Sequence, residues 1–405
     1  MPAPAAHQPG WGYAAPANYY YAQQPMMQAT PAYFQEPVPS AEEEMPEPES
    51  LEEYYSDEYY PRHGHRMGSV LLGLLGMVAP YSEGGRCEPH WFDLHAEFLY
   101  LSLDNHGPFI EFSKETGAIT PRISSNDLEY GDEPGFRVTG TYQTGPGSNL
   151  EFTYLGMFDF KQESSATGVD NLNSIFSDFL NHDPQGQEQF DQADFHQVSL
   201  ANNLDSLELN YRRRWVGPTC LLQGSWLIGV RYTKLKEKLR FISHASRDTD
   251  ADLIDDVGGI GNCMVDATNY MTGPQIGGDL WLCVLPGLNV GLDGKFALLG
   301  NNAKQFTSIS GDDINTGFVG IVPDEVTGND KVTFLGEASL NVTYRVNHKL
   351  TIRAGYELIL LEGVALALEN FNPEVPLFGF TRTPSFSDGG SLFYDGFTFG
   401  GELMW

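Results

Sequence analysis

Apolar and polar residues alternate along most of the chain from position 91 onward. In 331–345, for example, Leu340 and Val342 share one parity, while Glu337, Ser339 and Asn341 share the other. A period of two residues is typical of a β-strand whose two faces meet different surroundings. The pattern predicts ten strands, at 91–103, 133–144, 148–160, 202–215, 219–236, 268–285, 288–300, 331–345, 349–362 and 391–405.

The connections between these strands alternate in length. Those after the second, fourth, sixth and eighth strands are short: Gly145-Pro146-Gly147, Val216-Gly217-Pro218, Pro286-Gly287 and Asn347-His348. The other connections are long and polar. Short periplasmic turns and long extracellular loops characterise bacterial outer-membrane barrels. We therefore expect an all-β fold over 91–405, an antiparallel transmembrane β-barrel of about ten strands (twelve is the alternative), located in the bacterial outer membrane. Its outward face would contact outer-membrane lipid.

Aromatic residues fall at the strand ends, where amphipathic rings favour a membrane interface. We expect a periplasmic girdle made of Trp91, Trp215, Tyr344 and Trp405. A second girdle would lie at the opposite ends of the strands and contain Tyr100, Phe160, Tyr232 and Tyr270.

The other parity of the strands carries charges of both signs and would line the lumen. These residues are Asp93, Glu97, Arg137, Glu151, Glu208, Arg212, Arg214, Arg231, Asp279, Asp293, Lys295, Glu337, Arg345, Arg353, Glu357 and Glu402. Barrel diameter grows with strand number, and about eight strands leave room only for side chains. Two interpretations stay open: an ion-pair network that fills the lumen, or a narrow polar pore with these residues as its lining.

The first 90 residues lack this alternation. Residues 1–66 are rich in Pro and Tyr and then in Glu and Asp, and such a segment buries too little apolar area to order itself. We interpret it as a disordered tail, with a cell-wall tether as the functional alternative. Residues 67–90 hold an apolar run at 67–80 that is similar to the core of a signal peptide. Met67 as the true start, an earlier removed signal, and packing near the barrel mouth are the three alternatives.

Composition excludes several function classes. The net charge of −31 argues against a nucleic-acid partner, which requires a basic face. No run of apolar residues is long enough for a transmembrane helix. No motif for a cofactor is present, and the four cysteines include no zinc-type spacing. Cys220 and Cys283 fall near the periplasmic ends of neighbouring strands, but their parity places them on opposite faces.

Two weaker constellations could carry chemistry. Asp248, Asp250 and Asp252 offer oxygen ligands in the spacing of a calcium loop, without its Gly or closing Glu. Asp194 and His196 lie two apart, as in a water-activating pair at a barrel rim. We expect neither a metal site nor catalysis, with rim proteolysis as a remote alternative.

The last strand is apolar on one parity, with Phe397, Phe399, Leu403 and Trp405. It is similar to the terminal signal that the barrel assembly machinery reads, and it should pair with the first strand to close the ring. Together with 135–142, 229–239, 269–280 and 346–364, this segment resembles the β-barrel porin 7 family of planctomycete-type bacteria. The resemblance implies a porin-like barrel and supplies no catalytic motif. We expect a structural or narrow-pore role, with surface attachment through the long loops and the tail as the alternative.

Overall fold

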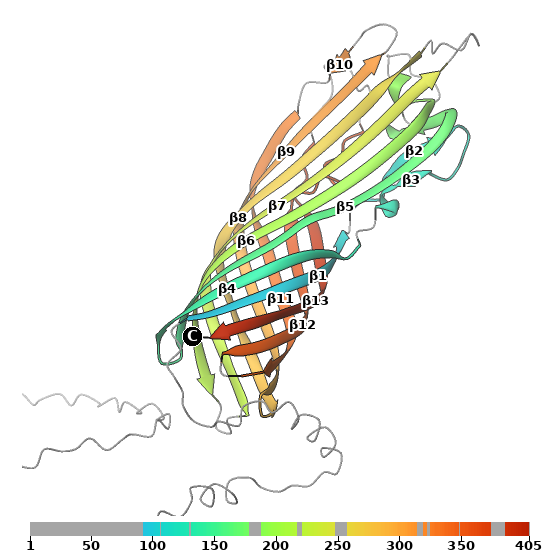
Figure 1. Ribbon diagram of the computed structural model, residues 1–405. Coiled ribbons are helices and arrows are strands. Elements are labelled where there is room, and N and C mark those ends of the chain that lie inside the picture. The colour runs from blue at the N-terminus through green and yellow to red at the C-terminus, as the bar shows by residue number, and fades with distance from the viewer. Residues whose placement is uncertain are drawn as a thin grey trace, which may run out of the picture. The chain divides into compact units, whose positions relative to one another are not determined.

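A computed structural model describes residues 92–105, 107–128, 131–177, 188–216, 221–247, 257–313, 319–321, 325–347, 349–373 and 385–404. Ten antiparallel strands form a closed ring (Figure 1). In ring order they are β1 (Phe92–Asn105), β4 (Glu133–Gly145), β5 (Ser148–Ser174), β6 (Ala193–Val216), β7 (Leu222–Arg247), β8 (Val257–Leu285), β9 (Leu288–Asp313), β11 (Glu325–Arg345), β12 (Leu350–Val364) and β13 (Gly390–Met404). The barrel prediction is confirmed, and no described helix is long and apolar enough to cross a membrane.

The ring closes between its first and last strands, as expected. Residues 93–105 of β1 pair with residues 404–392 of β13 in an unbroken antiparallel register. Short elements attach near the extracellular end: β2 (Glu111–Glu115), β3 (Ile123–Ser124), β10 (Val319–Ile321) and the 3₁₀ turns η1 (Ser125–Asp127), η2 (Ile175–Ser177) and η3 (Glu188–Phe190).

The periplasmic turns follow from local chemistry. Gly147 and Gly287 each follow a proline and adopt φ of 70° and 81°. Glycine suits this left-handed conformation because it has no Cβ to clash, and proline fixes the preceding φ. In the third described turn, Asn347 Oδ1 accepts hydrogen bonds of 2.8 Å from the backbone N–H groups of Lys349 and Leu350. These turns hold the register of the flanking strands.

Strand length divides the ring into two parts. β1, β4, β12 and β13 have 13 to 15 residues, whereas β5, β6, β7, β8 and β9 have 24 to 29, and β11 has 21. A tilted strand of about ten residues already crosses a membrane. The long strands therefore continue well beyond it on the extracellular side (Figure 1). Much of what the sequence pattern suggested as polar loops, around 161–174, 193–201, 237–247, 257–267, 301–313 and 325–330, is strand.

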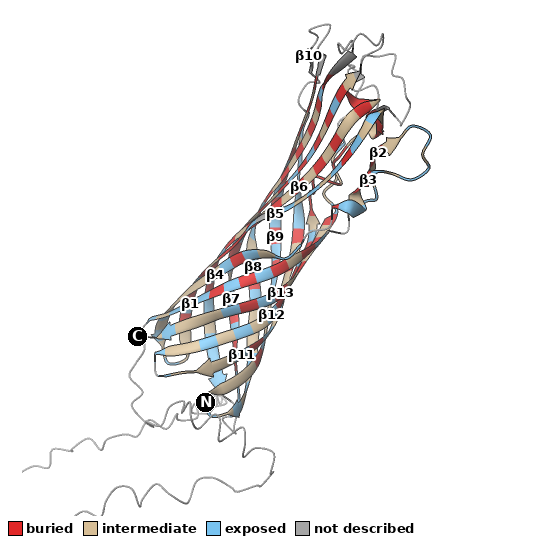
Figure 2. Ribbon diagram, turned by 45° about the vertical axis from the view of Figure 1, so that its right-hand side comes forward, coloured by how far each residue is buried: buried red, intermediate tan, exposed pale blue. Residues whose placement is uncertain are grey.

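Along these long strands the apolar residues change from the outward face to the inward face, as β7 shows. In its periplasmic half the outward Trp226 and Ile228 are 47% and 52% exposed, as lipid-facing residues are, and Arg231 points inward. Beyond Tyr232 the outward positions carry lysines, and the inward Leu235 and Phe241 are fully buried. Figure 2 shows buried residues along the extracellular part of the strands. The molecule is thus a membrane barrel continued by a water-exposed barrel wall with an apolar inside.

The structure describes six of the eight residues that the sequence assigned to the aromatic girdles. Tyr100, Tyr232 and Tyr270 are exposed near the extracellular edge of the apolar belt. Phe160 was wrongly assigned to this girdle: an irregularity in the β5–β6 pairing between Met157 and Phe160 turns its ring inward, where it is fully buried. Trp215 and Tyr344 lie at periplasmic strand ends, and Trp91 and Trp405 lie outside the described residues.

Candidate functional site: a polar cavity below a closed lumen

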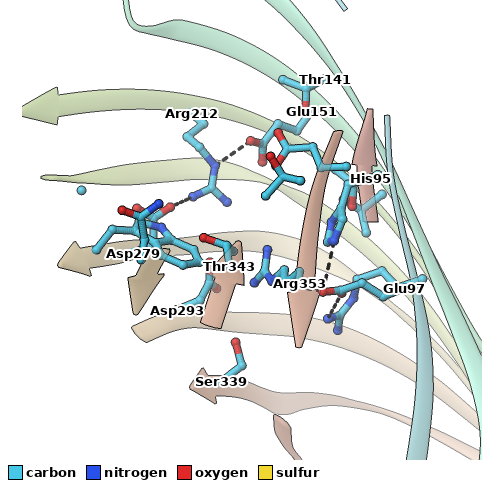
Figure 3. A pocket seen from close by; sticks show the side chains of 18 of the residues that line it. His95, Glu97, Thr141, Glu151, Arg212, Asp279, Asp293, Ser339, Thr343 and Arg353 are labelled. Atoms are coloured by element: carbon cyan, nitrogen blue, oxygen red, sulfur yellow. Dashed lines mark hydrogen bonds and ion pairs between the residues drawn. The ribbon is translucent and has the colours of Figure 1, made fainter. Parts of the chain in front are cut away.

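A polar cavity of about 450 Å³ occupies the periplasmic part of the lumen. Its lining includes Arg214, Arg345 and Met404, which lie at the periplasmic ends of β6, β11 and β13, so the cavity reaches that rim. Figure 3 shows side chains from several strands converging on it. The strand alternation produces this lining, because every second residue of each strand points inward.

Ion pairs organise the cavity wall. Arg212 Nε lies 2.6 Å from Glu151 Oε1, and the same guanidinium contacts Asp279 (Figure 3). On the opposite wall, Arg353 Nε lies 3.2 Å from Glu97 Oε1, and its guanidinium lies over the Trp281 ring at 5.6 Å from the centroid. Arg212 and Arg353 therefore each have carboxylates within reach, which offsets part of the cost of removing these charges from bulk water.

A layer of six charged side chains, four of them buried and two half-buried, crosses the lumen at the inner end of the cavity. Arg231 Nη2 on β7 lies 2.6 Å from Glu337 Oε1 on β11, three strands away around the ring. Lys295 Nζ on β9 lies 3.0 Å from Glu208 Oε2 on β6. The remaining pair joins Arg137 on β4 to Glu357 on β12. We call these six residues the ionic layer. Because its pairs connect non-adjacent strands, it spans the lumen and does not merely line the wall.

The sixteen charged residues that the sequence assigned to the lumen fall into three groups. Thirteen line the cavity: Glu97, Arg137, Glu151, Arg212, Arg214, Asp279, Asp293, Lys295, Glu337, Arg345, Arg353, Glu357 and Glu402. Glu208 and Arg231 lie deeper, in the ionic layer, and Asp93 is half-buried at the start of β1 outside the cavity lining. His95, which the sequence pattern did not single out, also lines the cavity, with Nε2 3.2 Å from Glu97 Oε1.

Above the ionic layer the lumen contains a large apolar cluster together with buried polar side chains such as Asn202 and Asn269. Phe112, Phe176, Phe190, Phe241 and Phe371 form a cluster of ring contacts with centroids 5.1 to 6.5 Å apart. They come from β2, η2, η3, β7 and the β12–β13 connection. Aromatic rings at such separations pack favourably and exclude water. Several extracellular connections thus fold inward and fill the barrel.

The segment Gly363–Phe371, which we call the inner segment, continues from the end of β12 into the lumen. At Gly363 the chain adopts φ of 84°, the β12–β13 pairing becomes irregular, and the Gly363 carbonyl accepts a 2.7 Å hydrogen bond from Thr333 Oγ1. Residues 364–368 are buried almost completely. The pairing resumes once, between Val364 and Gly390, and the chain then leaves the wall and turns into the barrel.

Polar side chains of the opposite wall hold the inner segment by its backbone. Asn269 on β8 both donates to the Ala365 carbonyl and accepts from the Ala365 N–H, each at 2.8 Å. Glu237 on β7 accepts hydrogen bonds from the N–H groups of Ala367 at 2.6 Å and Leu368 at 3.4 Å. Since β7 lies four strands from β12 around the ring, the inner segment spans the lumen. Buried backbone groups need such partners, and here the wall supplies them.

Glu237 and His196 are buried titratable groups of this extracellular half, beyond the lipid-facing belt. Burial raises the pKa of Glu237 to about 7, against the opposing effect of the two backbone donors. Burial lowers the pKa of His196 to about 3, so its imidazole is neutral. Hydrogen bonds to the inner segment fix the Glu237 carboxyl, and contacts with Ser113 and Phe241 fix the His196 ring.

The Asp194–His196 pair is not arranged for catalysis. His196 is fully buried, its Nδ1 lies 2.7 Å from Ser113 Oγ, and its ring packs on Phe241 with 5.2 Å between centroids. Asp194 instead accepts a hydrogen bond from the Asp170 N–H. A general base must reach a water or substrate, and this imidazole is enclosed by protein.

The other residues that the sequence singled out are the possible calcium ligands and the two cysteines near the periplasmic strand ends. Asp248, Asp250, Asp252 and Cys220 lie outside the described residues. Among the residues that the structure describes, no group of three or more His, Cys, Asp or Glu is placed to hold a metal ion. Cys283 Sγ contacts the Leu285 carbonyl at 3.5 Å.

A closed ten-stranded ring with an apolar belt and a charged lumen defines a porin-like outer-membrane barrel. The chain belongs to the family described as "Putative beta barrel porin-7 (BBP7)", whose model matches residues 192–405, more than half of the chain. The resemblance seen in the sequence is thereby confirmed. No curated protein matches the sequence.

Solved structures with a similar course of the chain are distant. The outer membrane protease OmpT from Escherichia coli has 9% identity and a TM-score of 0.42, covering 80% of this chain and 100% of that one. A major outer membrane protein from Thermus thermophilus has 9% identity and a TM-score of 0.25, covering 78% and 100%. The P. putida toluene transporter TodX has 10% identity and a TM-score of 0.24, covering 78% and 91%. At such values the likeness carries no information on activity.

Proposed function

We propose that this protein is a narrow, gated pore of the bacterial outer membrane, represented here in its closed state. The periplasmic cavity is the permanent polar part of the path. The inner segment is the gate that closes the path from the extracellular side.

The hydrogen bonds between the wall and the backbone of the inner segment carry this proposal. The closure is made by a chain segment that enters the lumen beyond Val364, and not by the strands themselves. Asn269 and Glu237 bind the backbone beyond Val364, the last residue of β12, so residues 365–371 can leave without breaking any strand pairing. A loop is the usual place for such motion, because few strand contacts restrain it.

A structural role is the second candidate, and the ionic layer favours it. The pairs Arg231–Glu337 and Lys295–Glu208 each join strands three apart around the ring, and they cross the lumen without contribution from the inner segment. A barrel that only anchors the extracellular wall in the membrane would need no path. In that case the cavity below would be the blind end of a sealed cylinder.

Planar-bilayer recording distinguishes the two functions. In one variant, residues 365–371 are replaced by Gly and Ser at unchanged length, which removes the apolar and carboxyl-bonded part of the gate. A second variant adds Arg231→Ser and Glu337→Ser, which removes a matched cation and anion from the ionic layer. A control variant carries the same Gly/Ser replacement at 374–380, farther along the same connection.

We expect little or no current through the wild type and the control. The gate variant should show discrete steps, and the combined variant larger ones. The shift in gel mobility between boiled and unboiled samples verifies that each barrel is folded. If both folded gate variants are as silent as the wild type, the pore proposal is wrong and the structural role stands.

A further inference from the structure

A row of cations lies on the outer surface of the barrel, directly beyond the lipid-facing belt. On β7 the outward positions after Tyr232 are Lys234, Lys236, Lys238 and Arg240. Lys161 lies on β5, and its strand neighbour Ala201 on β6 pairs in turn with Lys238. We call these five residues the basic band.

Carboxylates offset only part of this charge. Asp266 Oδ2 lies 3.0 Å from Lys236 Nζ and 3.7 Å from Lys238 Nζ, and Glu163 Oε2 lies 3.1 Å from Lys161 Nζ. Asp205, opposite Lys234 on β6, accepts a 3.0 Å hydrogen bond from Tyr154. Five cations thus face three carboxylates, in a chain whose net charge is −31. The basic band is therefore a locally positive surface on a protein that is strongly negative as a whole.

The remaining contacts leave the cationic groups accessible. Lys234 Nζ lies over the Tyr270 ring at 5.7 Å from the centroid, and Arg240 Nε donates a 3.0 Å hydrogen bond to Asn262 Oδ1. Lys238 and Arg240 are exposed. Arg240 retains its terminal guanidinium nitrogens for a planar partner such as a phosphate.

The position of the basic band relative to the membrane identifies the kind of partner. The lipid-facing Val230 and Tyr232 immediately precede it on the same face of the same strand. With a rise of about 3.3 Å per residue and a strand tilt of about 40°, the four β7 cations lie about 5 to 20 Å beyond Tyr232. The nearest cations are level with lipid headgroups, and the farther ones match a large headgroup that projects outward.

We propose that the basic band binds a phosphate-bearing lipid of the outer leaflet. The apolar belt below it contacts the acyl chains, and the lysines contact the headgroup phosphates. Clustered lysine and arginine next to a membrane surface attract anionic headgroups in this way. This inference rests on the membrane-spanning fold and does not require the pore to open.

Native mass spectrometry of the detergent-solubilised full chain tests the proposal, with diphosphoryl lipid A as the probe. The test variant is Lys234→Gln/Lys236→Gln/Lys238→Gln. The matched control is Lys114→Gln/Lys331→Gln/Lys349→Gln, which removes the same charge outside the basic band. Dephosphorylated lipid A and inorganic phosphate are the two comparison ligands.

We expect the wild type and the control to retain lipid A and the test variant to bind it at least about tenfold more weakly, since each lysine near an anionic surface contributes about a fivefold effect. Dephosphorylated lipid A should bind weakly to all three proteins. Equal binding of lipid A to the folded test variant would overturn the proposal. Displacement of lipid A by inorganic phosphate alone would overturn it as well, because it would indicate a site for free anions.

Discussion

The two halves of the lumen are closed by different physical means. The periplasmic half is polar, and its closure is the ionic layer, in which Arg231 and Glu337 are nearly inaccessible to water. The extracellular half is mostly apolar. The cluster of five phenylalanines around Phe241 and the inner segment fill it. In the membrane part, the outward residues meet lipid and are apolar, and the inward residues are polar. In the extracellular part, the outward residues meet water and are polar, so the inward residues can form an apolar core. The same strands therefore support two interiors, and the upper one is filled partly by chain that lies outside the strands of the ring.

The strongest way to break the lower half is to remove one member of a buried pair. Arg231→Ala removes one of the two cations that Glu337 and Glu208 share and leaves Lys295 as the other, and we expect the free energy of unfolding to fall by about 3 to 5 kcal/mol. Denaturant titration in detergent, followed by band shift, measures this loss. Lys114→Ala, which breaks the more exposed Lys114–Glu111 pair, is the control and should change stability by less than about 1 kcal/mol.

The matching change in the upper half is Leu239→Ala. Leu239 is fully buried on the inner face of β7, and its truncation should cost about 2 to 4 kcal/mol through lost burial and a cavity. The same titration measures it. Ile228→Ala, on the lipid-facing side of the same strand, should cost clearly less; equal losses at both positions would contradict the assignment of the two faces.

pH should act on the upper half through Glu237. Its raised pKa, about 7 in the folded protein against an ordinary value of 4.5, means that the unfolded chain loses the proton first. The contribution of Glu237 to the free energy of unfolding is therefore at its maximum below pH 4.5, where the carboxyl is protonated in both states. It falls as the pH rises from 4.5 to about 7 and is constant at higher pH. Glu237→Gln lacks this titration, so its stability relative to the wild type should increase over that interval by up to about 3 kcal/mol. A constant difference between the two proteins from pH 4.5 to 7 would contradict the burial of this carboxyl.

The smallest expected effect concerns the glycine at which the inner segment begins. Gly363 has φ of 84°, and a side chain there costs about 1 to 2 kcal/mol in this conformation. Gly363→Ala should therefore shift the gate away from its closed position and raise the frequency of brief current steps. Gly294→Ala is a suitable control, because a Cβ there meets ordinary contact distances; identical recordings from both variants would count against a hinge at Gly363.

The sequence predicted the membrane half of the barrel well and the extracellular half poorly. Strands such as 331–345 and 349–362 were found because apolar residues of one parity meet lipid, and the prolines and glycines at 146–147 and 286–287 mark the turns. In β7 the apolar positions change parity after Tyr232, from Val230 to Leu235, so a search for one continuous apolar face ended there. The alternation itself continued, and allowing its phase to invert would have found the long strands.

The closure of the lumen could not be predicted from local pattern. The pairing of Arg137 with Glu357, 220 positions away, depends on which strands face each other across the ring. In the sequence the inner segment looks like the apolar end of a strand. Only the three-dimensional structure shows that Asn269 and Glu237 lie opposite its backbone. Charges of both signs on one parity indicated a polar lumen, and the three-dimensional register determined that they cross it.

Access to the lumen from each side of the membrane tests the central claim most directly. Ser339 lines the periplasmic cavity, and Leu239 lies in the apolar half above it. Each is replaced by cysteine in a chain whose four native cysteines are replaced by alanine, and a membrane-impermeant thiol reagent is applied to intact cells and to opened cells. The account predicts that Ser339→Cys reacts only in opened cells, through the periplasm, and that Leu239→Cys reacts in neither. Rapid reaction of Ser339→Cys in intact cells would show an open path from outside and would contradict the closed lumen.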